Sequence, residues 1–195
     1  MLVKLTQEQF KARHGEVFDR VFLPVSTLVD LWAVPFRDDS WQVVAVVALN
    51  DLDPPEYRAL VLAARAVGDE EAVMTDAEAE PRHQYPVLFT WPPDRLWDIY
   101  HAGPVGVDAA LFGSSGTWGV YFCWEPRIAY LAGTAAFMET FLGELGGIEA
   151  PKRGLEDMVD ATEDPLELEV ISTVLEHVGW DREVMREKHP KGAGI

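Results

Sequence analysis

The stretch from Trp118 to Leu145 reads WGVYFCWEPRIAYLAGTAAFMETFLGEL and contains one complete supersecondary unit. Aromatic and β-branched residues dominate Trp118 to Trp124, a Glu-Pro pair follows, and Arg127 to Leu131 is again mostly apolar, which predicts a β-hairpin. From Thr134 onward, apolar side chains recur at helical spacing and predict a helix. A hairpin that leads into a helix in this way is typical of an α+β protein.

Upstream of this unit, two more strands and a helix are indicated. Trp41 to Leu49 is rich in valine and nearly all apolar, which predicts a central strand covered on both faces. A helix is expected to begin at an N-cap, Asp53, with proline in its first turn, and to end at Gly68. Pro86 to Trp91 is typical of a further strand.

The two ends of the chain carry helix signals. Thr6 and Gln9 have the spacing of a capping box, and the helix that they begin is expected to stop near Gly15. Asp164, followed by proline, predicts the start of a second helix that ends at Gly179.

These elements predict a single α+β domain over residues 1–195, with a mixed or antiparallel sheet flanked by helices. Within it, residues 155–195 are expected to form an acidic C-terminal helical segment. The strand and helix periodicities predict a core of Val43, Val44, Val46, Val47, Ile128, Tyr130, Phe137, Phe141, Ile171 and Val174.

The glycine-rich segment Phe112 to Gly119, FGSSGTWG, lacks the spacing of known catalytic loops. A nucleophile elbow needs G-x-S-x-G before a helix, and a phosphate loop needs a lysine, whereas none occurs between Lys11 and Lys152. We expect a tight turn that enters the strand at Trp118.

Potential metal ligands and nucleophiles are scattered. The five histidines form no short ligand pair, so we expect neither a metal nor a cofactor. Cys123 is the only cysteine and stands inside an apolar strand pattern, where a packed thiol is expected. We therefore expect no enzyme. The alternative, an enzyme whose acid and base groups are scattered carboxylates, stays open.

A single cysteine also argues against a disulfide-built secreted protein. The first residues contain no signal-peptide pattern, and no apolar run reaches the roughly 18–20 residues that a membrane span needs. We expect a soluble, cytoplasmic protein.

Net charge is the strongest functional signal. The chain has 33 Asp and Glu against 16 Lys and Arg, a formal net charge of −17. Solubility of a small domain needs a net charge of only about 2–8 in magnitude. The electric field of a strongly negative protein repels nucleic acid and anionic membranes and attracts cationic partners. It therefore predicts a basic protein as the partner.

The acids are concentrated in two segments. Residues 69–80 hold six acids and no base and are expected to form a solvated loop or a weak helix. Residues 154–181 hold nine acids and no Lys or Arg. The candidate partner-binding residues are Asp69, Glu70, Glu71, Asp157, Asp160, Glu163 and Glu167.

The segment from Leu111 to Leu145 resembles bacterial immunity proteins that accompany polymorphic toxins. The resemblance rests on the pattern F-x-x-S-G-x-W-G, a hairpin, and G-T-x-x-F-M at the start of a helix. The matching residues are Phe112, Ser115, Gly116, Trp118, Gly119, Gly133, Thr134, Phe137 and Met138. The resemblance implies a cytoplasmic antidote that binds and blocks one toxin, and from the acidic surface we expect the block to be by occlusion. A nucleic-acid-mimicking regulator is a further alternative, since it would share the acidic surface.

Overall fold

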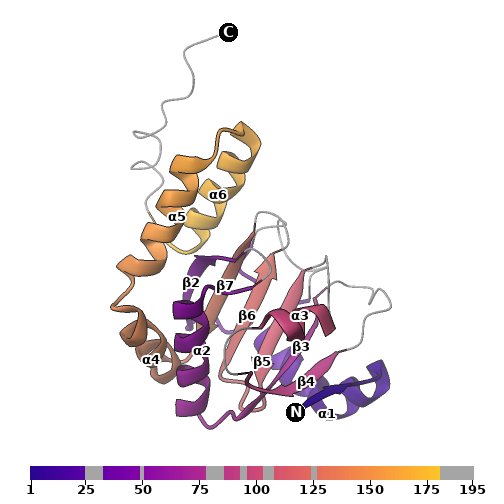
Figure 1. Cartoon of the computed structure of the whole chain (residues 1–195). Helices are drawn as coiled ribbons and strands as arrows, with labels where there is room; N and C mark the ends of the chain where they lie inside the picture. Colours follow the sequence, from indigo (N-terminus) through magenta and orange to yellow (C-terminus); the bar gives the residue numbers. More distant parts are fainter. Residues whose placement is uncertain are drawn as a thin grey trace.

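The computed structural model describes residues 1–24, 33–48, 51–77, 86–92, 96–102, 108–123 and 127–180. Within these ranges the chain forms a seven-stranded sheet in the order β1-β4-β3-β5-β6-β7-β2, and every neighbouring pair of strands is antiparallel (Figure 1). The strands are β1 (Leu2–Lys4), β2 (Gln42–Val47), β3 (Glu71–Asp76), β4 (Val87–Thr90), β5 (Ala109–Gly113), β6 (Trp118–Cys123) and β7 (Ile128–Gly133). The predicted α+β class is confirmed, and the sheet is antiparallel.

Helices cover both faces of this sheet. The helices are α1 (Gln7–Val21), α2 (Pro54–Ala66), α3 (Trp97–Ala102), α4 (Ala135–Leu145), α5 (Glu149–Ala161) and α6 (Pro165–His177). On one face, α2 and α4 pack on side chains of β2, β6 and β7 in a cluster that includes Val44, Trp118 and Phe137. On the other face, α1, α5 and α6 contribute to a second cluster that includes Phe112 and Tyr130. One sheet therefore supplies both halves of the hydrophobic core.

The predicted core is confirmed with two adjustments. Eight of the ten residues named above are buried, whereas Val43 and Val47 are half-buried. Both valines lie in β2, which stands at the edge of the sheet formed by the described residues and pairs there with β7. The prediction that this strand is central is therefore wrong. Its coverage on both faces is confirmed, because Val44 and Val46 join one cluster while Ala45 joins the other.

The first helix is longer than expected. The capping box is present, since Thr6 Oγ1 accepts a hydrogen bond from Gln9 N at 3.2 Å and Gln9 Oε1 accepts one from Thr6 N at 2.9 Å. The helix nevertheless continues through Gly15 to Val21. Glycine inside a helix costs only about 0.5–1 kcal/mol. Burial of Val21, with Phe18 partly buried beside it, outweighs that cost.

The acidic segment that begins at Asp69 is not a loop or a helix. β3 runs from Glu71 to Asp76 and pairs with both β4 and β5 in the middle of the sheet. The short apolar run Ala72-Val73-Met74 is buried and holds the strand in place. Residues 78–80 lie outside the described ranges.

The C-terminal helical segment begins earlier than expected, although its last described helix, α6, begins where it was predicted. The predicted N-cap of α6 is confirmed, because Asp164 Oδ1 accepts a hydrogen bond from Leu166 N at 2.9 Å. The preceding helix, α5, already begins at Glu149, before the segment expected to be helical. Residues 181–195 of that segment lie outside the described ranges.

Candidate functional site

One predicted partner-binding residue is not at the surface. Asp69 is only 2% exposed, and its carboxylate accepts four hydrogen bonds from the glycine-rich turn. The donors are Ser114 Oγ at 3.0 Å, Ser115 N at 2.9 Å, Ser115 Oγ at 2.5 Å and Trp118 Nε1 at 2.8 Å. Since every one of these contacts is internal, the assignment of Asp69 to a partner-binding surface is wrong.

The Asp69 carboxylate accounts for the conformation of the glycine-rich segment Phe112 to Gly119, FGSSGTWG. The expected tight turn is confirmed by a hydrogen bond from Gly116 N to Gly113 O at 3.3 Å and by a φ of +64° at Gly116. Trp118 then stacks on Phe137, with ring centroids 5.3 Å apart and planes 2° from parallel. Among the residues that carry the resemblance to immunity proteins, Ser115 and Trp118 thus bind Asp69, and Trp118 also packs on Phe137 in the core.

The neighbouring acids Glu70 and Glu71 are exposed. Glu70 forms an ion pair with Arg65 at 3.3 Å, and both side chains remain largely solvent-accessible. An exposed pair of this kind contributes about 0–1 kcal/mol. Both acids remain candidates for partner binding.

The other four candidates belong to α5, α6 and the turn between them. Asp157, Asp160 and Glu163 are exposed, and Glu167 is half-buried. Asp160 interacts with other groups of the chain. Asp157 and Glu167 line a cavity of about 460 Å³, which we call the acidic groove.

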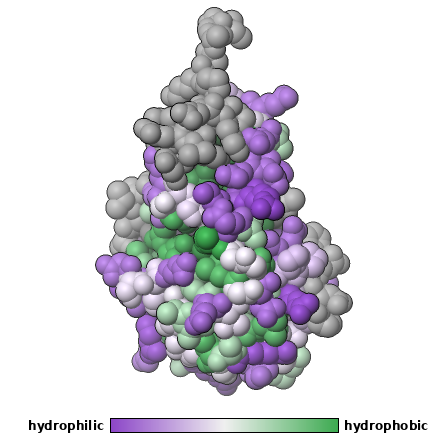
Figure 2. All heavy atoms as spheres, turned by 90° about the vertical axis from the view of Figure 1, so that its left-hand side faces the viewer, coloured by the Kyte–Doolittle hydropathy of each residue, from purple (hydrophilic) through white to green (hydrophobic). Residues whose placement is uncertain are grey.

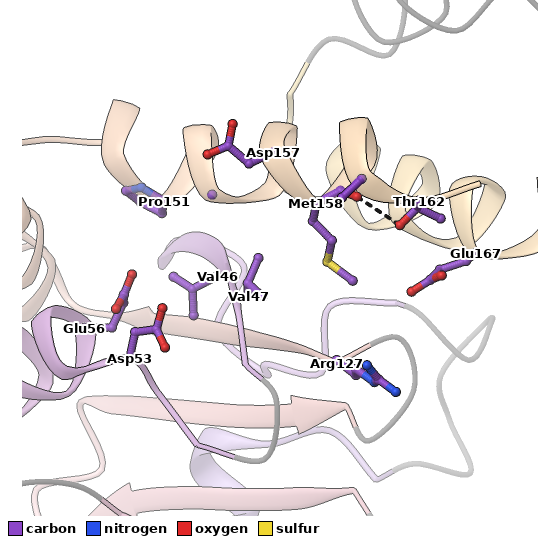
Figure 3. A pocket seen from close by; sticks show the side chains of 12 residues that line it. Val46, Val47, Asp53, Glu56, Arg127, Pro151, Asp157, Met158, Thr162 and Glu167 are labelled. Atoms are coloured by element: carbon purple, nitrogen blue, oxygen red, sulfur yellow. Dashed lines mark hydrogen bonds between the residues drawn. The ribbon is translucent and has the colours of Figure 1, made fainter. Parts of the chain in front are cut away.

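The acidic groove lies where the end of β2, the start of α2, and the α5–α6 pair come together (Figure 3). Of the residues that line it, only Asp157 and Glu167 were predicted from the sequence as site residues, because the walls of the groove come from four separate parts of the chain. Figure 2 shows an apolar area in the middle of this side of the molecule, bordered by hydrophilic side chains. The residues that line the groove are Val46, Val47, Asp53, Glu56, Arg127, Pro151, Gly154, Asp157, Met158, Ala161, Thr162 and Glu167.

Charge in the groove is predominantly negative. Asp53, Glu56, Asp157 and Glu167 supply four carboxylates, whereas Arg127 is the only cation among the described residues that line it. Figure 3 shows Asp53 and Glu56 at one end and Arg127 with Glu167 at the other. The groove therefore carries a net negative charge, concentrated at its α2 end.

Glu56 is the most unusual of these acids. Its Oε2 atom is shielded from solvent and has no hydrogen-bond partner in the described part of the chain. Burial raises the pKa of Glu56 above its ordinary value; a hydrogen bond with its own backbone opposes this, and the nearby Asp53 carboxylate adds to it. A partly desolvated carboxylate gains from a cation placed beside it, because the opposite charge offsets the cost of burying the carboxylate's own charge.

Arg127 occupies a special backbone position. Its φ of +69° is in the left-handed region, which a residue other than glycine rarely adopts. The backbone is held by a hydrogen bond from Ala48 N to Arg127 O at 2.8 Å, which ties the start of β7 to the end of β2. Arg127 has an exposed side chain, and the described residues form no ion pair with it.

Other side chains of chemically reactive types, Cys123 and Tyr121, lie outside the groove. Cys123 is 3% exposed, and burial, followed by the charge of Asp108, raises its thiol pKa well above the ordinary value. Tyr121 donates a hydrogen bond to Asp108 Oδ2 at 3.3 Å, and burial likewise raises the pKa of its hydroxyl. A raised pKa disfavours the thiolate that nucleophilic chemistry requires. In the described ranges, no group of three or more His, Cys, Asp or Glu side chains is arranged to hold a metal ion.

Comparison with protein-family models, curated proteins and solved structures gives no match to this chain. The fold and site define it as an α+β protein with a seven-stranded antiparallel sheet and an acidic groove beside β2. Among the described helices, none combines the length and apolar character that crossing a bilayer requires.

Proposed function

We propose that this protein is a cytoplasmic binding protein that docks a basic protein and neutralises it, most specifically as an immunity protein that blocks a cognate toxin. The observation that carries this proposal is the gathering of carboxylates from α2, α5 and α6 around one groove in a chain of net charge −17. Like charges placed this close repel one another, and a cationic partner relieves that repulsion.

Occlusion is the mechanism that fits this surface. Exposed acids of α5 and α6 would pair with Lys and Arg residues that the partner uses to hold its own anionic substrate. Charge complementarity would accelerate encounter, while desolvated contacts at the groove would slow dissociation. The resemblance supports the same function, and its residues Ser115, Trp118 and Phe137 act inside the fold, so the binding surface must be elsewhere.

A second candidate function is an enzyme in which Glu56 serves as a general acid. The observation in its favour is a carboxyl of raised pKa in a cavity, a combination common at catalytic sites. The two candidates differ in stoichiometry, because an inhibitor acts at one equivalent of its partner and an enzyme turns over many equivalents of substrate.

The test begins with capture of binding proteins from a lysate of the native host at low salt. The recovered partner is then titrated with the purified chain in an assay of the partner's own activity. We expect complete loss of that activity at one equivalent. Recovery of no discrete partner, or a partner whose activity is unaffected, contradicts the proposal.

Charge-reversal variants locate the surface. The triple variant Asp157→Lys, Glu163→Lys and Glu167→Lys is expected to lose neutralisation. A matched variant with the same change in net charge, Glu8→Lys, Glu16→Lys and Glu139→Lys, alters exposed acids of α1 and α4 and is expected to retain it. Equal losses in both variants would indicate that only total charge matters.

A further inference from the structure

We propose that the acidic groove accepts one arginine side chain of the partner, with its guanidinium against Glu56 and its alkyl chain along the apolar wall. This inference rests on the proposed function and specifies which chemical group of the basic partner the groove recognises.

The shape of the groove suits a long side chain with a charged end. Its volume of about 460 Å³ lies within the range of about 300–1,000 Å³ typical of ligand pockets. Val46, Val47, Met158 and Ala161 supply apolar surface, and the carboxylates stand around it (Figure 3). Arginine combines an apolar stem with a charged head and can satisfy both kinds of surface at once.

Glu56 supplies the reason for a cation at the α2 end. Its Oε2 atom is buried and has no hydrogen-bond partner among the described residues, which makes the ionised carboxylate costly to hold there. A guanidinium in the groove would lie beside the half-buried Glu56 side chain, which lines it, and the Asp53 carboxylate at the N-cap of α2 adds to the negative potential there. Because guanidinium is less strongly hydrated than ammonium, a partly buried carboxylate favours arginine over lysine.

Arg127 sets the direction in which the side chain lies. It stands at the end of the groove away from Asp53 and Glu56 (Figure 3), so it repels a second cation there. The guanidinium is thus directed toward α2, and the peptide backbone that carries it lies on the Arg127 side.

The test uses the whole chain and three capped tripeptides, acetyl-Gly-X-Gly-amide with X as arginine, lysine or citrulline. Citrulline has nearly the shape of arginine but no charge. Binding is followed by NMR through the methyl signals of Met158 and of Val46 and Val47, which line the groove. We expect saturable shifts of these signals with the arginine peptide, weaker binding of the lysine peptide and no saturable shift with the citrulline peptide.

Variants test the role of Glu56. Glu56→Gln keeps the shape and removes the charge, and it is expected to weaken binding of the arginine peptide about tenfold, as expected for loss of a charge-assisted hydrogen bond. The matched variant Glu139→Gln, which changes an exposed acid of α4, is expected to bind like the original chain. Equal binding of citrulline or lysine, no response at Met158, or no effect of Glu56→Gln would overturn the inference.

Failure of the groove inference is distinguishable from failure of the proposed function. A partner that is captured and neutralised while the groove ignores the arginine peptide would remove the groove inference alone. A groove that binds arginine in a chain with no neutralising activity would remove the proposed function alone.

Discussion

Asp69 and Trp118 are joined by a hydrogen bond of 2.8 Å from the indole Nε1 to the carboxylate Oδ2 in the interior of the protein. The two residues are 49 positions apart, and the contact ties the start of β3 to the start of β6. Trp91 Nε1 donates to the backbone oxygen of Asp69 at 3.1 Å, so two indoles converge on this one residue. Asp69 is therefore a structural anchor of the sheet.

Replacement of Asp69 tests this role. Asp69→Ala leaves the buried donors of Ser115 and Trp118 without an acceptor, and we expect a loss of about 3–5 kcal/mol in the free energy of unfolding. Urea denaturation measures it, and Asp69→Asn, which keeps part of the network, should lose less. The neighbouring Glu70→Ala is the control and should change stability by less than about 1 kcal/mol. Equal effects at positions 69 and 70 would contradict the assignment.

Gly113 gives a second test of the same anchor. A Cβ atom there would collide with the Asp69 carboxylate, so Gly113→Ala should destabilise the protein by about 1–3 kcal/mol. Gly143→Ala is the matched control, since position 143 is an exposed position in α4 with open space for a Cβ. That variant should stabilise the protein by up to about 1 kcal/mol, because alanine favours helix. Thermal or urea unfolding of both variants checks the difference in sign.

Replacement of Phe141 tests the packing of α4 against the sheet. The side chain is completely buried and stacks on Phe137, with ring centroids 6.3 Å apart. Phe141→Ala should cost about 3–5 kcal/mol of unfolding free energy. Leu166→Ala, at a position 68% exposed, should have little effect. A small loss at Phe141 would mean that α4 does not pack on the sheet as described.

Glu56 predicts a pH dependence of stability. Its pKa is raised above the ordinary value of 4.5, so the folded chain holds this proton more tightly than the unfolded chain does. Stability from this group is therefore lost as the pH rises from 4.5 through the raised pKa, and the loss is complete above it. Glu56→Gln should accordingly be more stable than the original chain at pH 7, and this difference should shrink as the pH falls toward 4.5.

The control for this pH dependence is Glu139→Gln, which removes the same charge from an exposed position. Asp53, Asp157, Glu167 and Arg127 also face the groove, so both variants are compared at the same salt concentration. An advantage of Glu56→Gln that persists unchanged below pH 4.5, or that Glu139→Gln matches, would contradict burial of Glu56 as its cause.

Local sequence signals predicted those helices and strands in which the apolar pattern of the sequence matches the side chains that are buried in the fold. The β6–β7 hairpin, α4 and the caps at Thr6 and Asp164 were predicted because capping residues and apolar periodicity are local properties. β3 was missed because its buried apolar run is short and flanked by acids. α1 passed the expected stop at Gly15 because packing outweighs a weak helix breaker.

The candidate site could be predicted only in part. Asp157 and Glu167 were identified from acidic clustering, and they do line the groove. Asp53 was predicted only as a helix cap, and Glu56 and Arg127 were not singled out for the site, because they converge with α5 and α6 only through the tertiary fold. Asp69 was misassigned, since charge alone does not distinguish a solvated carboxylate from one enclosed by four donors.

The most direct test of the central claim is the association rate between this chain and its captured partner, measured from 0.1 to 1 M salt. The Debye length falls from about 10 Å to about 3 Å over that range, so docking through acidic α5 and α6 predicts a steep fall in the association rate with a smaller change in the dissociation rate. The variant Asp157→Lys, Glu163→Lys and Glu167→Lys should already associate slowly at 0.1 M salt and respond less to added salt. An association rate that ignores both salt and this variant would contradict the account.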